Sequence, residues 1–184
     1  MPNLEMLKGS SLTTSHDSIS QEPYDIIIND MQNGFMNENT DYLPSAISSF
    51  MKSNPFHIDN VIMTTLVGSP ESWPQDRARK AGVIKTLSDD FESRLVSPFP
   101  INDCSIVTHT SYTDIQGLKN SIKNTNVLLC GMETDSIIIT AAMLRDSGYH
   151  VSIIYDLTAT TLGTGTQIAM MSVMQHLFGA DSII

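Results

Sequence analysis

Cysteine is scarce in this chain, which has only Cys104 and Cys130 among its 184 residues. Each of the two lies within or at the end of an apolar run that is typical of a buried strand. We therefore favour two buried free thiols over a disulfide, as is usual for a cytoplasmic protein. No cysteine or histidine residues share the spacing of a zinc site, and we expect neither a metal nor a cofactor.

Positively charged residues are also few. The 10 Lys and Arg residues face 20 Asp and Glu residues, which gives a net charge of −10 and a pI of about 4.6. A surface this acidic repels phosphate backbones and anionic lipids, so nucleic acid and membrane are not expected partners. The sequence has no run of 18 apolar residues and no basic segment followed by an apolar one at its N-terminus. We expect a cytoplasmic protein without a transmembrane helix or a signal peptide.

The remaining composition predicts a single folded domain. The chain is 41% apolar over 184 residues, which is enough to bury a full core. Residues 1–22 are rich in serine and threonine and show no apolar period, so we interpret them as a loose N-terminal arm. The folded domain is expected over residues 23–184.

Apolar runs and helical patterns alternate along the folded part of the sequence. The short apolar runs predict strands at residues 24–30, 60–67, 104–109, 127–130, 151–155 and 182–184. Helical spacing predicts helices at residues 43–52, 114–123, 136–146 and 164–178. In the long connection between the second and third strands, a further helix is indicated by the spacing of Val83, Ile84, Leu87, Phe91 and Leu95. This alternation predicts an α/β fold with a mostly parallel sheet and helices on both faces.

Polar residues gather at three predicted strand ends, namely at Asp30, at His109 and in the turn from Gly131 to Ile137. In open parallel sheets a ligand lies beyond the carboxyl ends of the strands. The turn precedes a helix, whose free N–H groups attract anions and lower the pKa of a thiol placed there. Position 137 holds isoleucine, which leaves no nucleophile for the helix to activate.

Several segments resemble the isochorismatase-like superfamily, also called the cysteine hydrolases, from about residue 25 to the C-terminus. The family's first-strand motif is apolar residues followed by Asp-Met-Gln-Asn-Asp-Phe, and it corresponds here to Asp30-Met31-Gln32-Asn33-Gly34-Phe35. The fourth-strand motif Cys-Gly-Val-Glu-Thr-Asp-Val-Cys-Val corresponds to Cys130-Gly131-Met132-Glu133-Thr134-Asp135-Ser136-Ile137-Ile138. The resemblance implies a three-layer fold with a six-stranded sheet of order 3-2-1-4-5-6. The family also tends to have a cis peptide bond just after this glycine, which here would join Met132 and Glu133.

The resemblance implies a catalytic set that this chain keeps only in part. Amidases of the family use an Asp on the first strand, a Lys after the third strand and a Cys in the first helical turn after the fourth. Asp30 matches the Asp, whereas His109 occupies the Lys position and Ile137 the Cys position. Cysteine-amidase chemistry is therefore strongly disfavoured, and Cys130 ends its strand too early to replace the missing nucleophile.

Isochorismatases of the same family cleave a vinyl ether without a cysteine. Their Asp acts as a general acid, and water attacks the resulting oxocarbenium carbon. We expect Asp30 to act in this way on a small, carboxylate-bearing substrate, with His109 either orienting it or binding the substrate carboxylate. Ser136 as a replacement nucleophile is a weaker alternative, since no base is obviously adjacent to it. The candidate substrate-binding residues are Gly131, Met132, Glu133, Ser136, Ile137, Phe35 and Tyr112.

Two other hypotheses stay open. A pseudoenzyme would keep the fold and the pocket to bind a small molecule or a protein partner, and Ile137 and its neighbours would fill the cleft. A purely structural protein would use the oligomeric contacts that are common in the family, and we expect a homodimer or higher homo-oligomer. An enzyme instead predicts that Asp30 and His109 converge within reach of one water molecule.

Overall fold

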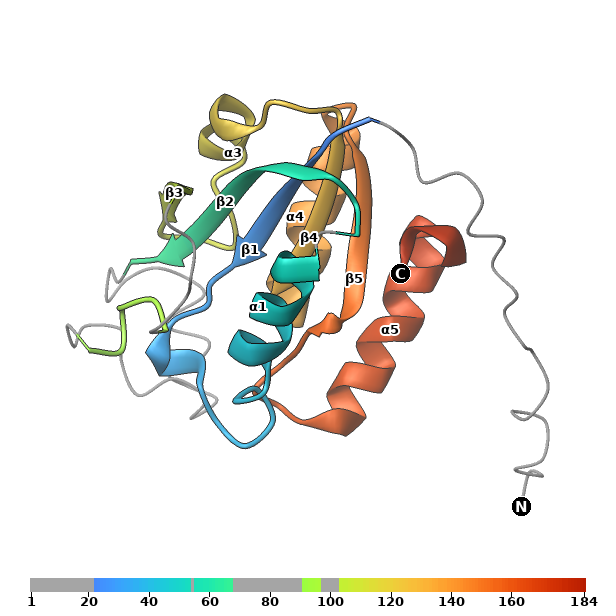
Figure 1. The fold of residues 1–184 in the computed structure, drawn as a ribbon. Coiled ribbons are helices and arrows are strands. Elements are labelled where there is room, and N and C mark those ends of the chain that lie inside the picture. The colour runs from blue at the N-terminus through green and yellow to red at the C-terminus, as the bar shows by residue number, and fades with distance from the viewer. Residues whose placement is uncertain (1–21, 54, 68–90, 97–102) are drawn as a thin grey trace, which may run out of the picture.

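The computed structural model describes residues 22–53, 55–67, 91–96 and 103–184 (Figure 1). Residues 1–21 of the predicted N-terminal arm therefore lie outside the described residues. Strands and helices alternate in the order β1 (Tyr24–Asn29), η2 (Asn33–Phe35), α1 (Leu43–Ser53), β2 (Ile58–Leu66), β3 (Ser105–His109), α3 (Ile115–Ser121), β4 (Asn126–Gly131), α4 (Thr134–Asp146), β5 (His150–Thr158), α5 (Thr164–Phe178) and η3 (Ala180–Ser182). Within these ranges, no helix has the length and apolar character needed to cross a bilayer.

The strands form one parallel sheet in the order β3-β2-β1-β4-β5, with β1 at its centre. Ile27 of β1 pairs with Ile62 of β2 on one side and with Leu129 of β4 on the other. All three side chains are fully buried, because a central parallel strand is covered on both faces. The predicted α/β class and the order of the first five strands are confirmed.

Two apolar cores lie on opposite faces of this sheet, because successive strand residues point to opposite sides. Ile26 and Ile28 belong to one core, which Leu43 of α1 helps to close. Ile27 belongs to the other core, which includes buried residues of α3 and α4 and Met174 of α5. Figure 1 shows α1 in front of the sheet, α4 behind it and α5 beside β5. Helices thus cover both faces, as predicted.

The sixth strand predicted at residues 182–184 does not form in the described residues. The chain turns after Gly179, which has a φ of +82°, and the next three residues make up the 3-10 helix η3. Only Ile183 then pairs with the sheet, in a single parallel bridge to Ile153 of β5. The prediction of six strands is therefore corrected to five at this edge, because η3 takes up Ser182 and Ile183 forms only an isolated bridge.

The helix predicted in the long connection lies mostly among residues 68–90, outside the described residues. Its expected end, at Phe91 and Leu95, lies in a described segment that consists of a turn and a bridge. The prediction of a helix is therefore wrong for residues 91–95. The reason is that residues 91–96 form one turn, closed by a hydrogen bond from the Arg94 N–H to the Phe91 carbonyl, and otherwise bond to the segment that follows β1.

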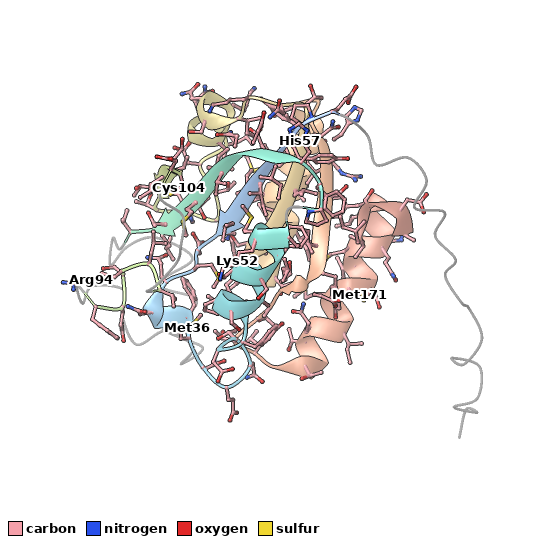
Figure 2. All side chains as sticks on the ribbon, in the orientation of Figure 1. Met36, Lys52, His57, Arg94, Cys104 and Met171 are labelled. Atoms are coloured by element: carbon pink, nitrogen blue, oxygen red, sulfur yellow. The ribbon has the colours of Figure 1, made fainter. Side chains whose placement is uncertain are left out.

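The partner of residues 91–96 is the loop that follows β1. The N–H groups of Asn33 and Gly34 donate to the carbonyls of Arg94 and Glu92, both at 2.9 Å. Figure 2 shows Arg94 at the edge of the molecule toward which β1 runs, whereas His57 lies at the opposite end of the sheet. Residues 91–96 are therefore held beside the strand end that carries Asp30.

The other end of the sheet is held by a buried carboxylate. Asp25 of β1 accepts hydrogen bonds from Asn60 Nδ2 at 2.7 Å, from the Lys123 N–H at 2.7 Å and from Asn124 Nδ2 at 2.5 Å. Buried carboxylates need such donors to remain in a folded interior. Asp25 thereby ties the start of β1 to β2 and to the segment before β4.

Candidate active site

Asp30 follows the central strand in a backbone conformation that residues with a side chain rarely adopt. Its φ of +45° lies in the left-handed region, where Asp and Asn are among the best tolerated of these residues. Asp30 is buried, with 3% of its surface exposed. The Thr64 hydroxyl of β2 donates to Asp30 Oδ1 at 2.6 Å, and Thr64 Oγ1 accepts from the Asp30 N–H at 3.1 Å. Thr64 thus fixes both the backbone and the side chain of Asp30.

His109, the last residue of β3, contacts the same carboxylate oxygen. Its Nε2 lies 2.8 Å from Asp30 Oδ1, and its Nδ1 lies 2.5 Å from the carbonyl oxygen of Ser111. A carbonyl only accepts, so Nδ1 carries a proton. Nε2 and Oδ1 share one further proton, and the Thr64 hydroxyl on Oδ1 favours the form with an imidazolium and a carboxylate. Both ring nitrogens are therefore occupied within the protein, which favours an orienting role for His109 over binding of a substrate carboxylate.

The pKa of His109 is raised above its ordinary value. Burial lowers this pKa, but the hydrogen bond that His109 donates to Asp30 and the negative charge of Asp30 outweigh burial. The Ser111 carbonyl and the charge of Asp114 raise it further. Because the folded pKa is higher than the unfolded one, His109 stabilises the folded protein fully below the unfolded pKa. That contribution is lost as the pH rises through the folded pKa.

We expect the contribution of His109 to the free energy of unfolding to fall as the pH rises above about 6.5, the ordinary pKa of histidine. Each unit by which folding raises the pKa of His109 corresponds to about 1.4 kcal/mol. Urea denaturation at closely spaced pH values measures the slope. His109→Gln should remove this part of the slope, whereas His176→Gln, which alters an exposed histidine of α5, should retain it. Identical slopes in all three proteins would contradict the assignment.

The turn after β4 packs closely against the backbone of β1. Gly131 has a φ of +110°, and a Cβ at this position would lie 2.3 Å from the carbonyl oxygen of Asn29. The Met132 N–H donates to that same oxygen at 2.8 Å. The peptide bond between Met132 and Glu133 is cis, as the resemblance implies. Glycine is required at position 131 because the two strands approach each other too closely for a side chain.

Ile137 and Ser136 lie in the first turn of α4, where the resemblance to the amidases predicts a nucleophile. Ile137 is fully buried and packs in the core on the α4 face. The Ser136 hydroxyl donates to the carbonyl of Tyr112 at 2.7 Å and accepts from Asn29 Nδ2 at 3.3 Å. In the described part of the chain, its hydrogen bonds reach no side chain that could act as a base. Neither residue is therefore arranged as a nucleophile.

Two of the predicted substrate-binding residues have partners elsewhere. The Glu133 carboxylate accepts from the Thr160 hydroxyl at 2.8 Å and from the Thr161 N–H at 3.1 Å. Burial raises the pKa of Glu133, although the hydrogen bonds from these two threonines oppose the shift. Phe35 is buried in the core on the α1 face. Glu133 thus links the start of α4 to the segment after β5, and Phe35 fills the interior.

Both cysteines are free thiols that resist ionisation. Cys130 is fully buried, and burial raises its pKa. Burial also raises the pKa of Cys104, and the charge of Asp103 adds to this effect. Only the thiolate is a good nucleophile, so neither cysteine is suited to acyl transfer near neutral pH. Within the described ranges, His, Cys, Asp and Glu side chains form no group of three or more that could hold a metal ion.

Two residues at this site, Asn29 and Thr64, were not among the candidates from the sequence. Ile28 pairs with Met63, so the residues that follow them, Asn29 and Thr64, are neighbours across β1 and β2. The signal that could have found them is polarity inside apolar runs, because polar groups in doubly buried strands need partners. The partners themselves depend on strand register and on the turn after β4.

Comparison with solved structures shows the same fold at low sequence identity. A cysteine hydrolase from Pseudomonas syringae pv. phaseolicola is 18% identical over 87% of both chains, with a TM-score of 0.67. An isochorismatase-like hydrolase from Alkaliphilus metalliredigens is 15% identical over 88% of this chain and 94% of that one, with a TM-score of 0.66. A pyrazinamidase/nicotinamidase from Streptococcus mutans is 14% identical over 88% of this chain and 99% of that one, also with a TM-score of 0.66.

Sequence comparison settles the family. No match to a curated protein sequence was found. The Isochorismatase domain, however, matches residues 26–180, which include all five strands but the first two residues of β1. This chain therefore belongs to the isochorismatase family.

Proposed function

We propose that this protein hydrolyses a small, carboxylate-bearing molecule without a cysteine nucleophile, with Asp30 as general acid and base. The supporting observation is the 2.8 Å contact between Asp30 and His109, which are only 3% and 4% exposed. A buried, oriented carboxyl group can exchange protons with a substrate away from bulk water. The carboxylate-bearing substrate is suggested by the resemblance to isochorismatases. Arg94 supplies positive charge on the segment that is bonded to the loop after Asp30.

In the proposed reaction, the Asp30 carboxylate first takes up a proton from solvent. It then transfers this proton to the terminal carbon of a vinyl ether and leaves an oxocarbenium ion at the neighbouring carbon. A water molecule adds to that carbon and returns a proton to Asp30. The resulting hemiketal releases an alcohol and a ketone, so one water molecule is consumed and the carboxyl group is regenerated. His109 remains protonated and stabilises the carboxylate that forms in the first step.

A catalytically inactive protein that binds a small molecule or a protein partner is the second candidate. It is favoured by Ile137, which is fully buried at the start of α4. A core side chain thus occupies the position from which the family's nucleophile would act. In such a protein the contact between Asp30 and His109 would serve only the fold.

A substrate screen separates the two candidates. We expect the wild-type protein to hydrolyse isochorismate or a related vinyl ether, and to leave simple amides intact. This activity should survive iodoacetamide, because burial keeps Cys104 and Cys130 protonated. Loss of activity on alkylation would show that a thiol carries the chemistry. A folded protein with no turnover on any substrate would favour the inactive candidate.

Ile137→Cys, assayed beside the wild type, tests what the missing nucleophile contributes. We expect no amide hydrolysis from this variant, because His109 at the Lys position is already bonded to Asp30.

We also propose that the protein self-associates through α5. This helix contains no Asp, Glu, Lys or Arg, and its residues Ile168 and Leu177 are 61% and 54% exposed. An exposed helix with apolar residues on its outer side commonly marks an interface. Because each chain carries a net charge of −10, two copies repel each other least across a surface without charges.

Light scattering after size-exclusion chromatography tests this association. We expect a molar mass of at least two chains for the wild type and of one chain for Leu177→Lys, because two lysines would face each other across the interface. Ile106→Lys is the matched control, since Ile106 is an exposed apolar residue of the edge strand β3. A wild-type mass of one chain would contradict the proposal.

A further inference from the structure

Asn29 is a buried polar residue in the middle of the site. Only 1% of its surface is exposed, and most of the residues before it in β1 are apolar. Its Nδ2 lies 2.5 Å from the carbonyl oxygen of Met132, 3.1 Å from Asp30 Oδ2 and 3.3 Å from Ser136 Oγ. Its Oδ1 lies 3.1 Å from Thr64 Oγ1. One side chain thereby touches β2, the turn after β4, the start of α4 and the carboxyl group of Asp30.

The donors of Asn29 can be assigned by counting hydrogens. The amide has two N–H groups, and the carbonyl of Met132 takes one of them at the shortest distance. The second N–H points between Asp30 Oδ2 and Ser136 Oγ. The hydroxyl of Ser136 has its own proton on the carbonyl of Tyr112, so it can only accept here. Asn29 is therefore the donor that holds Asp30 Oδ2.

The two oxygens of Asp30 are consequently unequal. Oδ1 receives the Thr64 hydroxyl at 2.6 Å and His109 Nε2 at 2.8 Å. In the described part of the chain, Oδ2 accepts the longer hydrogen bond from Asn29 Nδ2, at 3.1 Å. The proton between His109 and Oδ1 is held by two groups at once, whereas a proton on Oδ2 would be held by the carboxyl group alone.

We propose that Asn29 is a positioning residue that turns the carboxyl group of Asp30 so that Oδ2 exchanges protons with the substrate. Oδ1 remains bonded to His109 and Thr64 throughout. The acid form carries its proton on Oδ2, passes it to the substrate, and Oδ2 recovers a proton from the attacking water. The exchange with a substrate rests on the proposed function, but the orientation of the carboxyl group does not.

Asn29→Leu tests the positioning role without any substrate. Loss of the amide frees Asp30 Oδ2, so the carboxyl group can turn away from His109 Nε2. We therefore expect the pKa of His109, followed by the NMR signals of its imidazole ring, to move down from its raised value. The other charge that raises this pKa, Asp114, is left unchanged. Assignment of the His109 signals uses His109→Gln.

Asn60→Leu is the matched control. Asn60 is also a buried asparagine, and its Nδ2 also donates to an aspartate of β1, but at the other end of the sheet. It should lower stability and leave the pKa of His109 unchanged. Asn29→Ser, which is too short to reach Oδ2, provides a second test if Asn29→Leu does not fold. An unchanged pKa of His109 in the folded Asn29 variants would overturn the positioning role.

Kinetics then test the assignment of Oδ2. With the substrate found in the screen, Asn29→Leu should lower kcat by about 10–100-fold, as misplacement of a reacting group does, with little change in KM. A pKa shift without any loss in kcat would overturn the assignment of proton exchange to Oδ2. Absence of turnover in the wild type would instead count against the proposed function, because the titration alone decides whether Asn29 orients Asp30.

Discussion

Asp30→Asn is expected to lower kcat for the proposed hydrolysis by about 10²–10⁴-fold, the range that a general acid or base contributes. An amide has nearly the shape of a carboxyl group and tolerates the φ of +45° found at this strand end. The amide cannot deliver the proton or take one from water. The measurement is the steady-state rate at saturating substrate, with wild type and variant at equal concentrations of folded protein.

Asp25→Asn is the matched control for this experiment. Asp25 is likewise a buried carboxylate of β1, but its three hydrogen-bond donors lie at the opposite end of the sheet. We expect this variant to lose stability and to keep the kcat of the folded protein. Full activity in Asp30→Asn would remove Asp30 from the mechanism. Equal losses in the two variants would point to damage to the sheet instead of loss of the acid.

Gly131→Ala should produce the largest loss of stability among single substitutions at the site. The new Cβ would lie 2.3 Å from the carbonyl oxygen and 2.7 Å from the nitrogen of Asn29, and backbone atoms of a central strand cannot move aside cheaply. The φ of +110° adds backbone strain for any residue with a side chain. We expect the free energy of unfolding to fall by about 3 kcal/mol or more, as measured by urea denaturation.

Gly148→Ala separates the two causes of this loss. Gly148, just after α4, also has a positive φ, +94°, but a Cβ there meets nothing within 4 Å. Only the backbone strain applies, so the expected cost is about 1–2 kcal/mol. Equal costs at the two positions would show that the close approach of β4 to β1 is not what requires glycine at position 131.

The sheet could be predicted from the sequence because its strands are local apolar runs. The segment Tyr24–Asn29 lies at the centre of a parallel sheet, where burial on both faces removes the usual alternation of polar and apolar residues. The last strand could not be predicted in this way. Ile183 and Ile184 have the right composition, but η3 takes up Ser182 and only one bridge, from Ile183 to Ile153, forms.

The candidate site was predictable in its strand-end residues and not in its network. Asp30 and His109 follow from the rule that polar groups meet at the carboxyl ends of parallel strands. The contacts of Asn29 with Thr64 and Ser136 depend on register and on the turn at Gly131, which no local pattern records. Phe35 fits the family motif but is buried in the core. The motif could not predict this burial, because it does not show which side of a loop faces the interior.

β1 lies between β2 and β4, so it leaves the ribosome long before β4 has been synthesised. Tyr24 pairs with Asn126, which is 126 − 24 = 102 residues further along the chain. At about 5–20 residues per second, synthesis of that interval takes roughly 5–20 seconds. During this time an apolar strand is left with one edge unpaired, which is a template for aggregation. The yield of soluble protein should therefore depend on translation speed and chaperone supply as well as on the stability of the finished fold.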